Sequence, residues 1–372
     1  MKTSRLPGLH KLSLSERQRL ILTENPELLS SGGLTNINAD SFIENAIGVF
    51  ALPIGVATNF IINDIELLIP MVTEEPSIIA AASNAARLSR SCGGFRCECE
   101  QPVTTCEILT TNSLNKVSEF LEAKRDFIWN EINYCDPLLL SLGGGLRGID
   151  INEISESNTV LLLHMDVRDA MGANTVNTAG EKLSDILKEN GFEVVGTIIT
   201  NSFPQRTSTA SVRFNIEELT DLNPGWVSSF MTVAQWAEID PMRAVTHNKG
   251  IMNGVCAVLT ALGNDTRATE AAAHFRAVSN GKYRPLSHWK LTEDGYLEGV
   301  LSLPVAGASI GGLTSHHPLV SYLKNHFNFN TYKDVCCAAA CCGLANNFAA
   351  ILAISTVGIQ KGHMKLHQKK QV

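Results

Sequence analysis

The sequence predicts an α/β (α+β) protein of two domains. A small domain covers residues 102–202 and is inserted into a large domain made of residues 1–101 and 203–372. Two observations predict this arrangement. Helical and strand-like patterns alternate between residues 102 and 202, as in a self-contained α/β unit. The chain is also long enough, at 372 residues with 44% apolar residues, to build a large core.

The composition excludes several classes of protein. A net charge of −7 argues against nucleic-acid binding and requires that any anionic substrate be held by local basic groups. The N-terminal segment is polar, which argues against a secretory signal. The longest apolar stretch, residues 338–359, is broken by Gly343, Asn346 and Asn347, so no membrane span is expected.

The cysteines predict an intracellular protein. Two of the ten are close together, Cys97 and Cys99, and four form the doublets 336–337 and 341–342. This spacing matches no zinc-binding pattern well, and the neighbours of the doublets are mostly small apolar residues. Cysteine acts there as a small hydrophobic side chain, so we expect buried free thiols and a cytoplasmic protein.

In the first part of the large domain, Ser13 and Glu16 form a capping-box pattern that predicts a helix. Glycines and prolines predict extended and turning backbone over residues 44–59. A thin, alanine-rich helix is predicted over residues 78–90. Burial of Glu75 at its start would raise the pKa of this carboxyl and make it a proton donor near neutral pH. The alternative is an acidic residue that is simply favoured by the helix dipole.

In the small domain, helices are predicted over residues 114–132 and 169–190, and strands over residues 159–167 and 192–200. Residues 143–148 satisfy a Gly-x-Gly-x-x-Gly pattern, which indicates a Rossmann fold only where a helix follows. The segment that follows is polar and β-leaning. We therefore interpret these glycines as a turn.

Residues 169–178, DAMGANTVNT, are the stronger candidate for a cofactor site. Asp169 is the predicted N-cap, and small residues leave the first helical turn bare. Free backbone amides would then face a pyrophosphate at the positive end of the helix. The alternative is a capped helix that packs closely on a sheet.

In the second part of the large domain, a hairpin is predicted over residues 288–305 and a helix over residues 333–353. The adjacent histidines at 316–317 are interpreted as loop residues. His363 and His367 are spaced to clamp a metal from one helical face, but nothing supplies a third ligand. An acid–base role is therefore preferred for His363.

Residues 243–265 combine a cation, a carboxylate and several amides, and we take them as the chemical centre of the chain. Lys249 is predicted to project from a loop just before an apolar helix over residues 251–262, and Asp265 follows a helix stop at Gly263. A helix of that length separates the two charges, so they meet only if the chain folds back. The alternative is a surface lysine and an aspartate that never touch.

Six stretches of the sequence together resemble one known family. They are ENAIGVFALPIGVATNF, PMVTEEPSIIAAASNAARLSR, DVRDAMGANTVNT, THNKGIMNG, GNDTRATEAAAH and GIQKGHMKLH. In this order they are similar to the class II (bacterial and archaeal type) 3-hydroxy-3-methylglutaryl-CoA (HMG-CoA) reductases. The resemblance implies a large substrate domain with a central helix, and a small inserted nucleotide-binding domain that is not a Rossmann fold.

The resemblance also implies the activity. The enzyme would be an oxidoreductase of the mevalonate pathway, in isoprenoid biosynthesis. It would reduce HMG-CoA to mevalonate and CoA with two hydrides from NADH or NADPH, or run the reverse reaction. It would work as a homodimer with a shared active site, or as a larger assembly.

Roles for individual residues follow from the same resemblance. Lys249 would stabilise the charge on the thioester oxygen, Glu75 would deliver a proton to it, and Asp265 would couple the two. His363 would protonate the departing CoA thiolate. The residues expected to bind the substrate are Ser77, Arg243, Asn253 and Asn347. The residues expected to bind the cofactor are Asp136, Asp169, Met171, Gly172, Asn174 and Asn201.

One departure from the family concerns the C-terminal end. Family members usually continue past the GHM motif into a small helical flap, and this C-terminal flap domain is expected to be missing here. Its loss would change water exclusion and the position of His363. One alternative is therefore a flapless relative that binds CoA or nucleotide but is weakly active or inactive. A second alternative, an unrelated Rossmann dehydrogenase, rests on the lone glycine match at residues 143–148.

Overall fold

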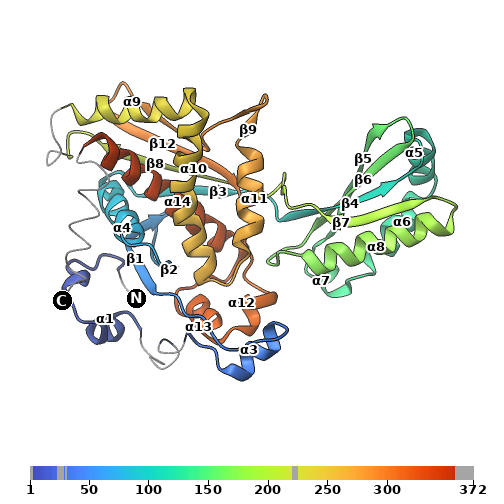
Figure 1. The fold of residues 1–372 in the computed structure, drawn as a ribbon, viewed down its shortest axis with the longest axis horizontal. Helices are drawn as coiled ribbons and strands as arrows, with labels where there is room; N and C mark the ends of the chain where they lie inside the picture. Colours follow the sequence, from blue (N-terminus) through green and yellow to red (C-terminus); the bar gives the residue numbers. More distant parts are fainter. Residues whose placement is uncertain (1–2, 23–28, 30–31, 220–224, 357–372) are drawn as a thin grey trace. The chain divides into compact units, whose positions relative to one another are not determined.

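The chain divides into two compact units, each with its own hydrophobic core. The large unit is made of Met1–Cys99 and Ser208–Val372, and the small unit is Glu100–Thr207. The predicted small domain, residues 102–202, lies within the small unit. Figure 1 shows the ribbon. The residues that the computed structural model describes are 3–22, 29, 32–219 and 225–356.

The small unit is an antiparallel sheet with helices packed against it. Its strands, in spatial order, are β5 (Gly145–Ser155), β6 (Asn158–Asp166), β4 (Val103–Thr110) and β7 (Val194–Ile199). Its helices are α5 (Leu114–Ala123), α6 (Arg125–Asn133), α7 (Pro137–Ser141) and α8 (Ala173–Glu189). α8 packs on β4 and β7, while α6 packs on α8 and β5.

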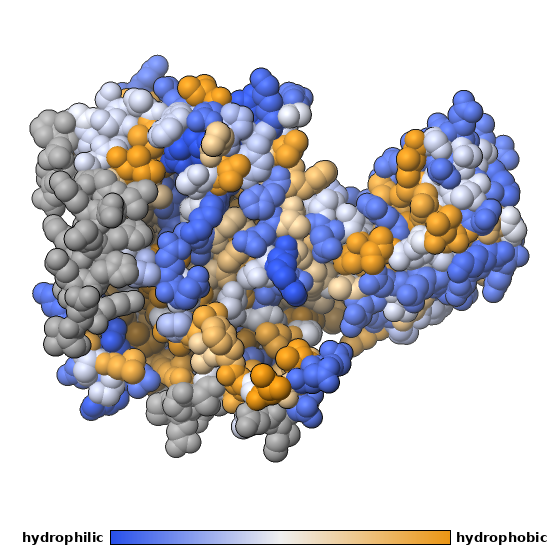
Figure 2. Space-filling model, viewed as in Figure 1, coloured by the Kyte–Doolittle hydropathy of each residue, from blue (hydrophilic) through white to orange (hydrophobic). Residues whose placement is uncertain are grey.

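The sequence of α8 explains its place on the sheet. Apolar residues such as Val176, Leu183 and Leu187 recur at helical spacing and are buried. Gly180 allows a close approach to the sheet, because a Cβ there would lie 2.4 Å from the Sγ of Cys106. The outer face of the helix is mostly hydrophilic, as Figure 2 shows.

The glycines before β5 form a turn, as predicted. Gly143 and Gly145 have φ angles of 78° and 106°, a region that favours glycine, and the chain passes from them directly into a strand. All three strand pairings of this sheet are antiparallel. Neither unit contains a doubly wound parallel sheet within the described residues, so the Rossmann alternative is wrong.

Two helix boundaries in the small unit differ from the prediction. The helix expected over residues 114–132 is two helices, because Lys124 leaves the helical region with φ −112° and ψ 14°. The helix expected from Asp169 begins at Ala173 instead. Its N-cap is Gly172, in the left-handed region with φ 86°, so the predicted capping role of Asp169 is wrong.

The large unit is built on a mixed six-stranded sheet. Its spatial order is β11 (Ser287–Leu291), β12 (Tyr296–Pro304), β8 (Thr207–Asn215), β3 (Phe95–Cys99), β1 (Ile54–Ile62) and β2 (Ile65–Val72). β1 and β3 are parallel, whereas β1–β2, β3–β8 and β11–β12 are antiparallel. β11 and β12 form the predicted hairpin. A separate two-stranded ribbon pairs β9 (Val278–Ser279) with β10 (Lys282–Tyr283).

Helices surround this sheet and fill the core of the large unit. The longer ones are α4 (Ile78–Ser89), α9 (Trp226–Ile239), α10 (Pro241–Ala261), α11 (Thr266–Arg276) and α14 (Tyr332–Ser355). The shorter ones are η1 (Leu9–Lys11), α1 (Leu14–Ile21), α3 (Asn36–Phe42), η2 (Arg90–Cys92), α12 (Gly312–His316) and α13 (Pro318–His326). The capping box predicted for Ser13 and Glu16 begins α1.

α14 is the central helix of the large unit, as the resemblance implied. It packs against α10, α4, α9, β3 and β12. Alone among the described helices it is long and apolar enough to cross a bilayer, yet 83% of its apolar window is buried inside the protein. Its apolar surface is therefore covered by the neighbouring elements of the core.

α10 starts earlier than the sequence predicted. Asp240 caps it by accepting a hydrogen bond from the backbone N–H of Met242 at 2.9 Å, and Pro241 occupies the first turn. The helix then continues through Gly250 to Ala261, followed by the predicted stop at Gly263, with φ 68°. Lys249 therefore lies in the middle of α10, and its predicted position in a loop is wrong.

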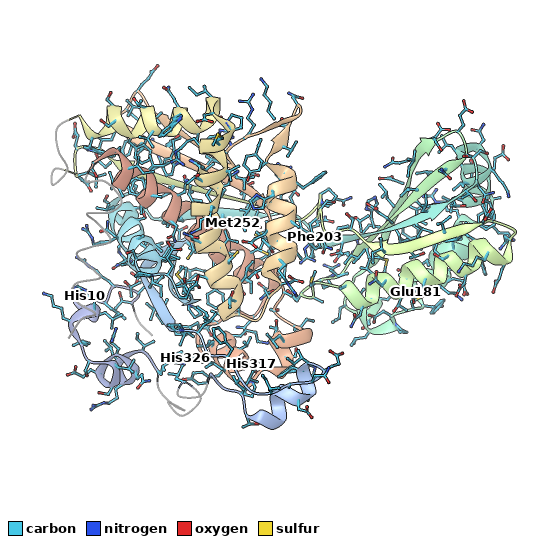
Figure 3. The ribbon with its side chains drawn as sticks, in the orientation of Figure 1. His10, Glu181, Phe203, Met252, His317 and His326 are labelled. Atoms are coloured by element: carbon cyan, nitrogen blue, oxygen red, sulfur yellow. The ribbon has the colours of Figure 1, made fainter. Side chains whose placement is uncertain are left out.

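The prediction that the adjacent histidines are loop residues is wrong for His316, which is helical, and holds for His317, which lies between two helices. His316 ends α12, and His317 is the N-cap of α13, where its Nδ1 accepts a hydrogen bond from the backbone N–H of Val320 at 3.4 Å. Figure 3 labels His317, and also His326 in the last turn of α13. His317 thus satisfies one of the free amide groups at the start of a helix.

A cluster of polar side chains joins α10, α14 and β11 inside the core. Asn347 Oδ1 accepts hydrogen bonds from Ser287 Oγ and Trp289 Nε1, both at 2.8 Å, and its Nδ2 donates to His247 Nε2 at 3.0 Å. His247 is 3% exposed. Burial, together with nearby basic side chains, lowers the pKa of His247 to about 3. The imidazole is therefore neutral at neutral pH.

Acid is expected to destabilise the protein through His247. Its pKa is about 3 in the folded chain against an ordinary value of 6.5, so only the unfolded chain gains this proton between those values. The free energy of unfolding should fall by roughly 4 to 5 kcal/mol as the pH drops through this window. The measurement is the urea midpoint of unfolding as a function of pH. His247→Gln should flatten this pH dependence, whereas His288→Gln, at an exposed position, should not. An unchanged pH dependence in His247→Gln would contradict the prediction.

Two glycines of α10 should respond in opposite ways to alanine. A Cβ at Gly254 would lie 2.5 Å from the carbonyl oxygen of Cys342 on α14, whereas one at Gly250 would only touch Ala350, at 3.9 Å. Gly254→Ala should therefore destabilise the fold by about 1–3 kcal/mol. Gly250→Ala should stabilise it by about 0.5–1 kcal/mol, because alanine is the better helix former. Chemical denaturation compares the two variants, and equal effects would refute the close packing.

Candidate functional site

The structure brings Lys249 and Glu75 together from distant parts of the sequence. Lys249 projects from the middle of α10, and Glu75 lies in the turn before α4, where its backbone N–H donates to Thr73 Oγ1 at 3.2 Å. The Nζ of Lys249 donates to Glu75 Oε2 at 3.0 Å. An ammonium and a carboxylate are thus held side by side in the large unit.

Glu75 is not buried as the raised-pKa hypothesis required. Its side chain is 36% exposed and that of Lys249 is 60% exposed. An ion pair this open to water contributes little to stability, because solvent screens it. The pair is therefore better suited to meeting a ligand than to holding the fold.

Asp265, the third charged group predicted for the centre, lies elsewhere in the large unit. It is the N-cap of α11, where its Oδ1 accepts a hydrogen bond from the backbone N–H of Ala268 at 3.0 Å. Arg267 Nε is 3.8 Å from the same oxygen. No hydrogen bond or ion pair joins Asp265 to Lys249 or Glu75 in the described parts of the chain. Within one chain, the predicted meeting of all three charges does not occur.

Two further candidate residues have polar groups without a hydrogen-bond partner among the described residues. The Oγ of Ser77 is buried and has no hydrogen-bond partner among the described residues, and its φ of 81° is strained for a residue other than glycine. Arg243 is 8% exposed, and no carboxylate pairs with it in the described ranges. Its guanidinium carbon lies 5.7 Å from the ring centre of Trp236. Burial lowers the pKa of Arg243.

A buried guanidinium without a carboxylate is costly, because its charge is partly removed from water without compensation. An anion that arrives from outside would supply the missing partner. Arg243 can form two parallel hydrogen bonds with a carboxylate. The buried hydroxyl of Ser77 can donate one more.

The two candidate amides differ in their surroundings. Asn253 is half-buried and lies one helical turn after Lys249 on α10, so both side chains project from the same face of the helix. Asn347 is held by the core cluster described above, through Ser287, Trp289 and His247. Its hydrogen bonds are internal, which gives it a part in positioning α10 against α14.

The cofactor candidates of the small unit surround the start of α8. A Cβ at Gly172 would lie 2.3 Å from Val167 Cγ1, so only glycine fits there. The carbonyl oxygen of Met171 accepts hydrogen bonds from Thr104 Oγ1 at 3.0 Å and from the guanidinium of Arg206 at 3.2 Å. The loop before α8 is thereby fixed, and the free amides of the first turn suit a phosphate group.

The remaining cofactor candidates are arranged around the same helix. Asp136 caps α7, and its Oδ2 accepts a hydrogen bond from Thr175 in the first turn of α8 at 3.3 Å. Asn174, in that same turn, is exposed. Asp169 lies in the preceding loop, and Asn201 lies in an exposed turn after β7. His363 lies outside the described residues.

Sequence reasoning missed two residues that organise these sites. Arg206 is fully buried and also donates to Thr104 Oγ1 at 2.9 Å, so it helps to fix the loop before α8. His247 joins α10 to Asn347 on α14. The signal for His247 was its place in the THNKG stretch, next to Lys249. Arg206 carried no local signal, because its partners are far away in the sequence.

Comparisons with known proteins agree on one family. A family model described as hydroxymethylglutaryl-coenzyme A reductase matches residues 13–368. The 3-hydroxy-3-methylglutaryl-coenzyme A reductase of Archaeoglobus fulgidus is 41% identical over 99% of this chain and 86% of its own length. A probable 3-hydroxy-3-methylglutaryl-coenzyme A reductase of Borreliella burgdorferi is 33% identical over 100% of this chain and 89% of its own.

Solved structures lead to the same family. The class II 3-hydroxy-3-methylglutaryl-CoA reductase of Streptococcus pneumoniae, bound to NADPH in open conformations, superposes with a TM-score of 0.87 at 32% identity. That match covers 94% of this chain and 99% of the other. A second structure of the S. pneumoniae enzyme superposes with a TM-score of 0.88 and covers 98% of this chain and 90% of the other. The chain belongs to the hydroxymethylglutaryl-coenzyme A reductase family.

Proposed function

We propose that this protein reduces HMG-CoA to mevalonate and CoA, using NADPH or NADH, as a step of the mevalonate pathway. Membership of the family supports the reaction, and the NADPH-bound S. pneumoniae relative supports the cofactor. The observation that carries the proposal is the pair of Lys249 Nζ and Glu75 Oε2, 3.0 Å apart and open to solvent. The buried hydroxyl of Ser77, which has no hydrogen-bond partner among the described residues, lies two residues further along the same turn.

Lys249 and Glu75 have complementary parts in this reaction. Each attack on the thioester or aldehyde carbon places negative charge on the carbonyl oxygen. The ammonium of Lys249 stabilises that charge, a contribution of about 3–4 kcal/mol for a well-placed group. Glu75 delivers a proton to that oxygen, and the ammonium of Lys249, which donates a hydrogen bond to Glu75 Oε2, can replace it.

The binding groups follow from the unsatisfied side chains. Arg243 and Ser77 hold the free carboxylate of the substrate, and Asn253 orients the substrate beside Lys249. The start of α8 and its neighbours hold the cofactor phosphates and ribose, with Asp136, Asp169, Met171, Gly172, Asn174 and Asn201 as the contacting residues. When bound, the reduced nicotinamide supplies the two hydrides. His363 protonates the departing thiolate of CoA.

Assembly and location are part of the same proposal. Asp265 does not reach Lys249 within one chain, so its coupling to Lys249 requires a neighbouring subunit or a movement of this chain. A homodimer with a shared site is supported by apolar side chains exposed near the junction of α9 and α10. These are Trp236, Ile239, Met242 and Val245, which are 48%, 81%, 83% and 50% exposed. Ten free cysteines support a cytoplasmic location.

Replacement of Lys249 is the direct test of the proposed chemistry. Lys249→Ala should lower kcat by about 10²- to 10³-fold, because the oxyanion loses its cation. The oxidation of NADPH and of NADH, followed by absorbance with HMG-CoA present, measures the effect. Lys290→Ala is the matched control, since Lys290 forms an exposed ion pair with Glu298 at 2.8 Å on the β11–β12 hairpin. Full activity in Lys249→Ala would refute the assignment.

Replacement of Arg243 tests carboxylate binding. Arg243→Ala should reduce kcat/KM for HMG-CoA by roughly 10- to 100-fold, mainly through KM, because charged hydrogen bonds are lost. Arg243→Lys should recover only part of the loss, since lysine cannot pair with both carboxylate oxygens in one plane. Arg213→Ala serves as control, because Arg213 pairs with Asp294 and Glu298 on the surface. An unchanged KM in Arg243→Ala would exclude this role.

A further inference from the structure

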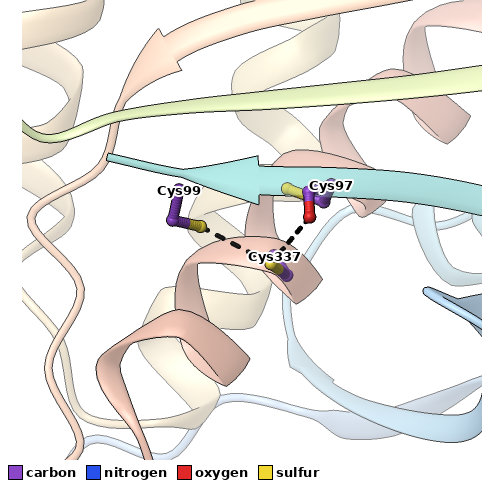
Figure 4. Close-up of side chains that lie close together, drawn as sticks. All are labelled: Cys97, Cys99 and Cys337. Carbon is purple, nitrogen blue, oxygen red and sulfur yellow. Dashed lines mark hydrogen bonds between the residues drawn. The ribbon is translucent and has the colours of Figure 1, made fainter. Parts of the chain in front are cut away.

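The large unit contains a cluster of thiols that the proposed reaction does not use. Cys97 and Cys99 lie on β3, and Cys337 lies on α14, more than two hundred residues away. Their three Sγ atoms all lie within 4.8 Å of one another. Cys99 Sγ and Cys337 Sγ are 3.5 Å apart. Figure 4 shows the three side chains, with a dashed line between these two sulfurs. None of the three forms a disulfide.

Local geometry places these thiols on facing surfaces. Residues two apart on a strand project from the same side, so Cys97 and Cys99 both face α14. Residues four apart on a helix share one face, so Cys341 lies one turn beyond Cys337 on the side that faces β3. Cys341 is fully buried. Two thiols on β3 and two on α14 thus lie at the contact between this strand and this helix.

The spacing of this cluster fits a thiolate-bound cation. Zn²⁺ binds cysteine sulfur at about 2.3 Å, so sulfur atoms in a tetrahedral zinc site lie about 3.8 Å apart. Here one pair of sulfurs is 3.5 Å apart and all three lie within 4.8 Å of one another, so small movements would bring them to that separation. Cysteine sulfur is a soft ligand that selects Zn²⁺ or Cu⁺ over Mg²⁺ and Ca²⁺. Cys97 is 5% exposed, and Cys99 and Cys337 are half-buried, so an ion would be largely shielded from water.

We propose that Cys97, Cys99 and Cys337 form a structural site for a thiophilic d¹⁰ cation, Zn²⁺ in the first place, with Cys341 as the fourth thiol. The site would hold β3 against α14 inside the large unit. It lies ten residues before Asn347 on α14, about 15 Å along the helix axis. Its function is therefore to stabilise the fold, and the proposed reaction does not depend on its chemistry.

Release of protons on metal binding is a second property by which this site can be recognised. Cysteine binds a metal ion as the thiolate, so each thiol must lose its proton to bind the cation. Metal affinity should therefore increase steeply with pH, and binding should release protons to the buffer.

Metal binding by the full chain is the decisive experiment. The reduced, chelator-treated protein is titrated with Zn²⁺ alone and desalted, and retained zinc is measured by atomic spectroscopy. We expect one tightly held zinc per chain and a higher thermal midpoint with zinc than without. With Co²⁺ as the probe, sulfur-to-cobalt charge-transfer bands should appear. A protein that retains no zinc and shows no such band would overturn the proposal.

Matched cysteine variants locate the bound ion. Cys99→Ala and Cys337→Ala, each checked for native secondary structure by circular dichroism, should lose the zinc, the cobalt bands and the thermal shift. Cys92→Ala and Cys135→Ala should keep all three, because these cysteines are not among the clustered thiols. Zinc that survives both cluster variants is bound elsewhere, which would refute the site. A Cys99–Cys337 disulfide that forms readily in zinc-loaded protein under air would likewise show that the thiols are not held by metal.

Discussion

The close contact between α10 and α14 is the constraint on which the large unit depends. A Cβ at Gly254 would lie 2.5 Å from the carbonyl oxygen of Cys342, and one at Gly343 would lie 2.7 Å from Val255 Cγ2. Glycine at both positions lets the helices approach more closely than side chains would allow. α10 carries Lys249 and α14 carries Asn347, so this contact sets where the polar groups of the core and of the candidate site lie.

The polar groups along this contact are stabilised in three different ways. His247 is kept neutral by burial and is satisfied on one side by Asn347. Lys249 lies near water and pairs with Glu75. Arg243 is stabilised in neither of these ways, because its side chain is buried and no described carboxylate pairs with it. The unsatisfied charge marks the place where an external anion would contribute most.

α14 also connects the candidate site with the thiol cluster. Its first half carries Cys337 and Cys341 against β3, and its second half carries Asn347 against α10. The sequence reading of these cysteines as small hydrophobic residues holds for Cys336 and Cys342, which are buried. It does not describe Cys97, Cys99 and Cys337, because what these three share is the close approach of their sulfur atoms and not burial alone.

The sequence by itself determined the elements that depend on near neighbours. The capping box at Ser13, the glycine turn before β5 and the β11–β12 hairpin follow from local backbone chemistry, and long matching stretches identified the family. Tertiary structure decided the rest. α10 continues through Gly250 because it is packed on α14, although glycine is a poor helix former. The pairing of Lys249 with Glu75, 174 residues away, and of Cys99 with Cys337, 238 residues away, arises only when the core closes. Spacing along a chain carries no information about contacts at that range, which is also why it could not show that Asp265 lies apart from Lys249.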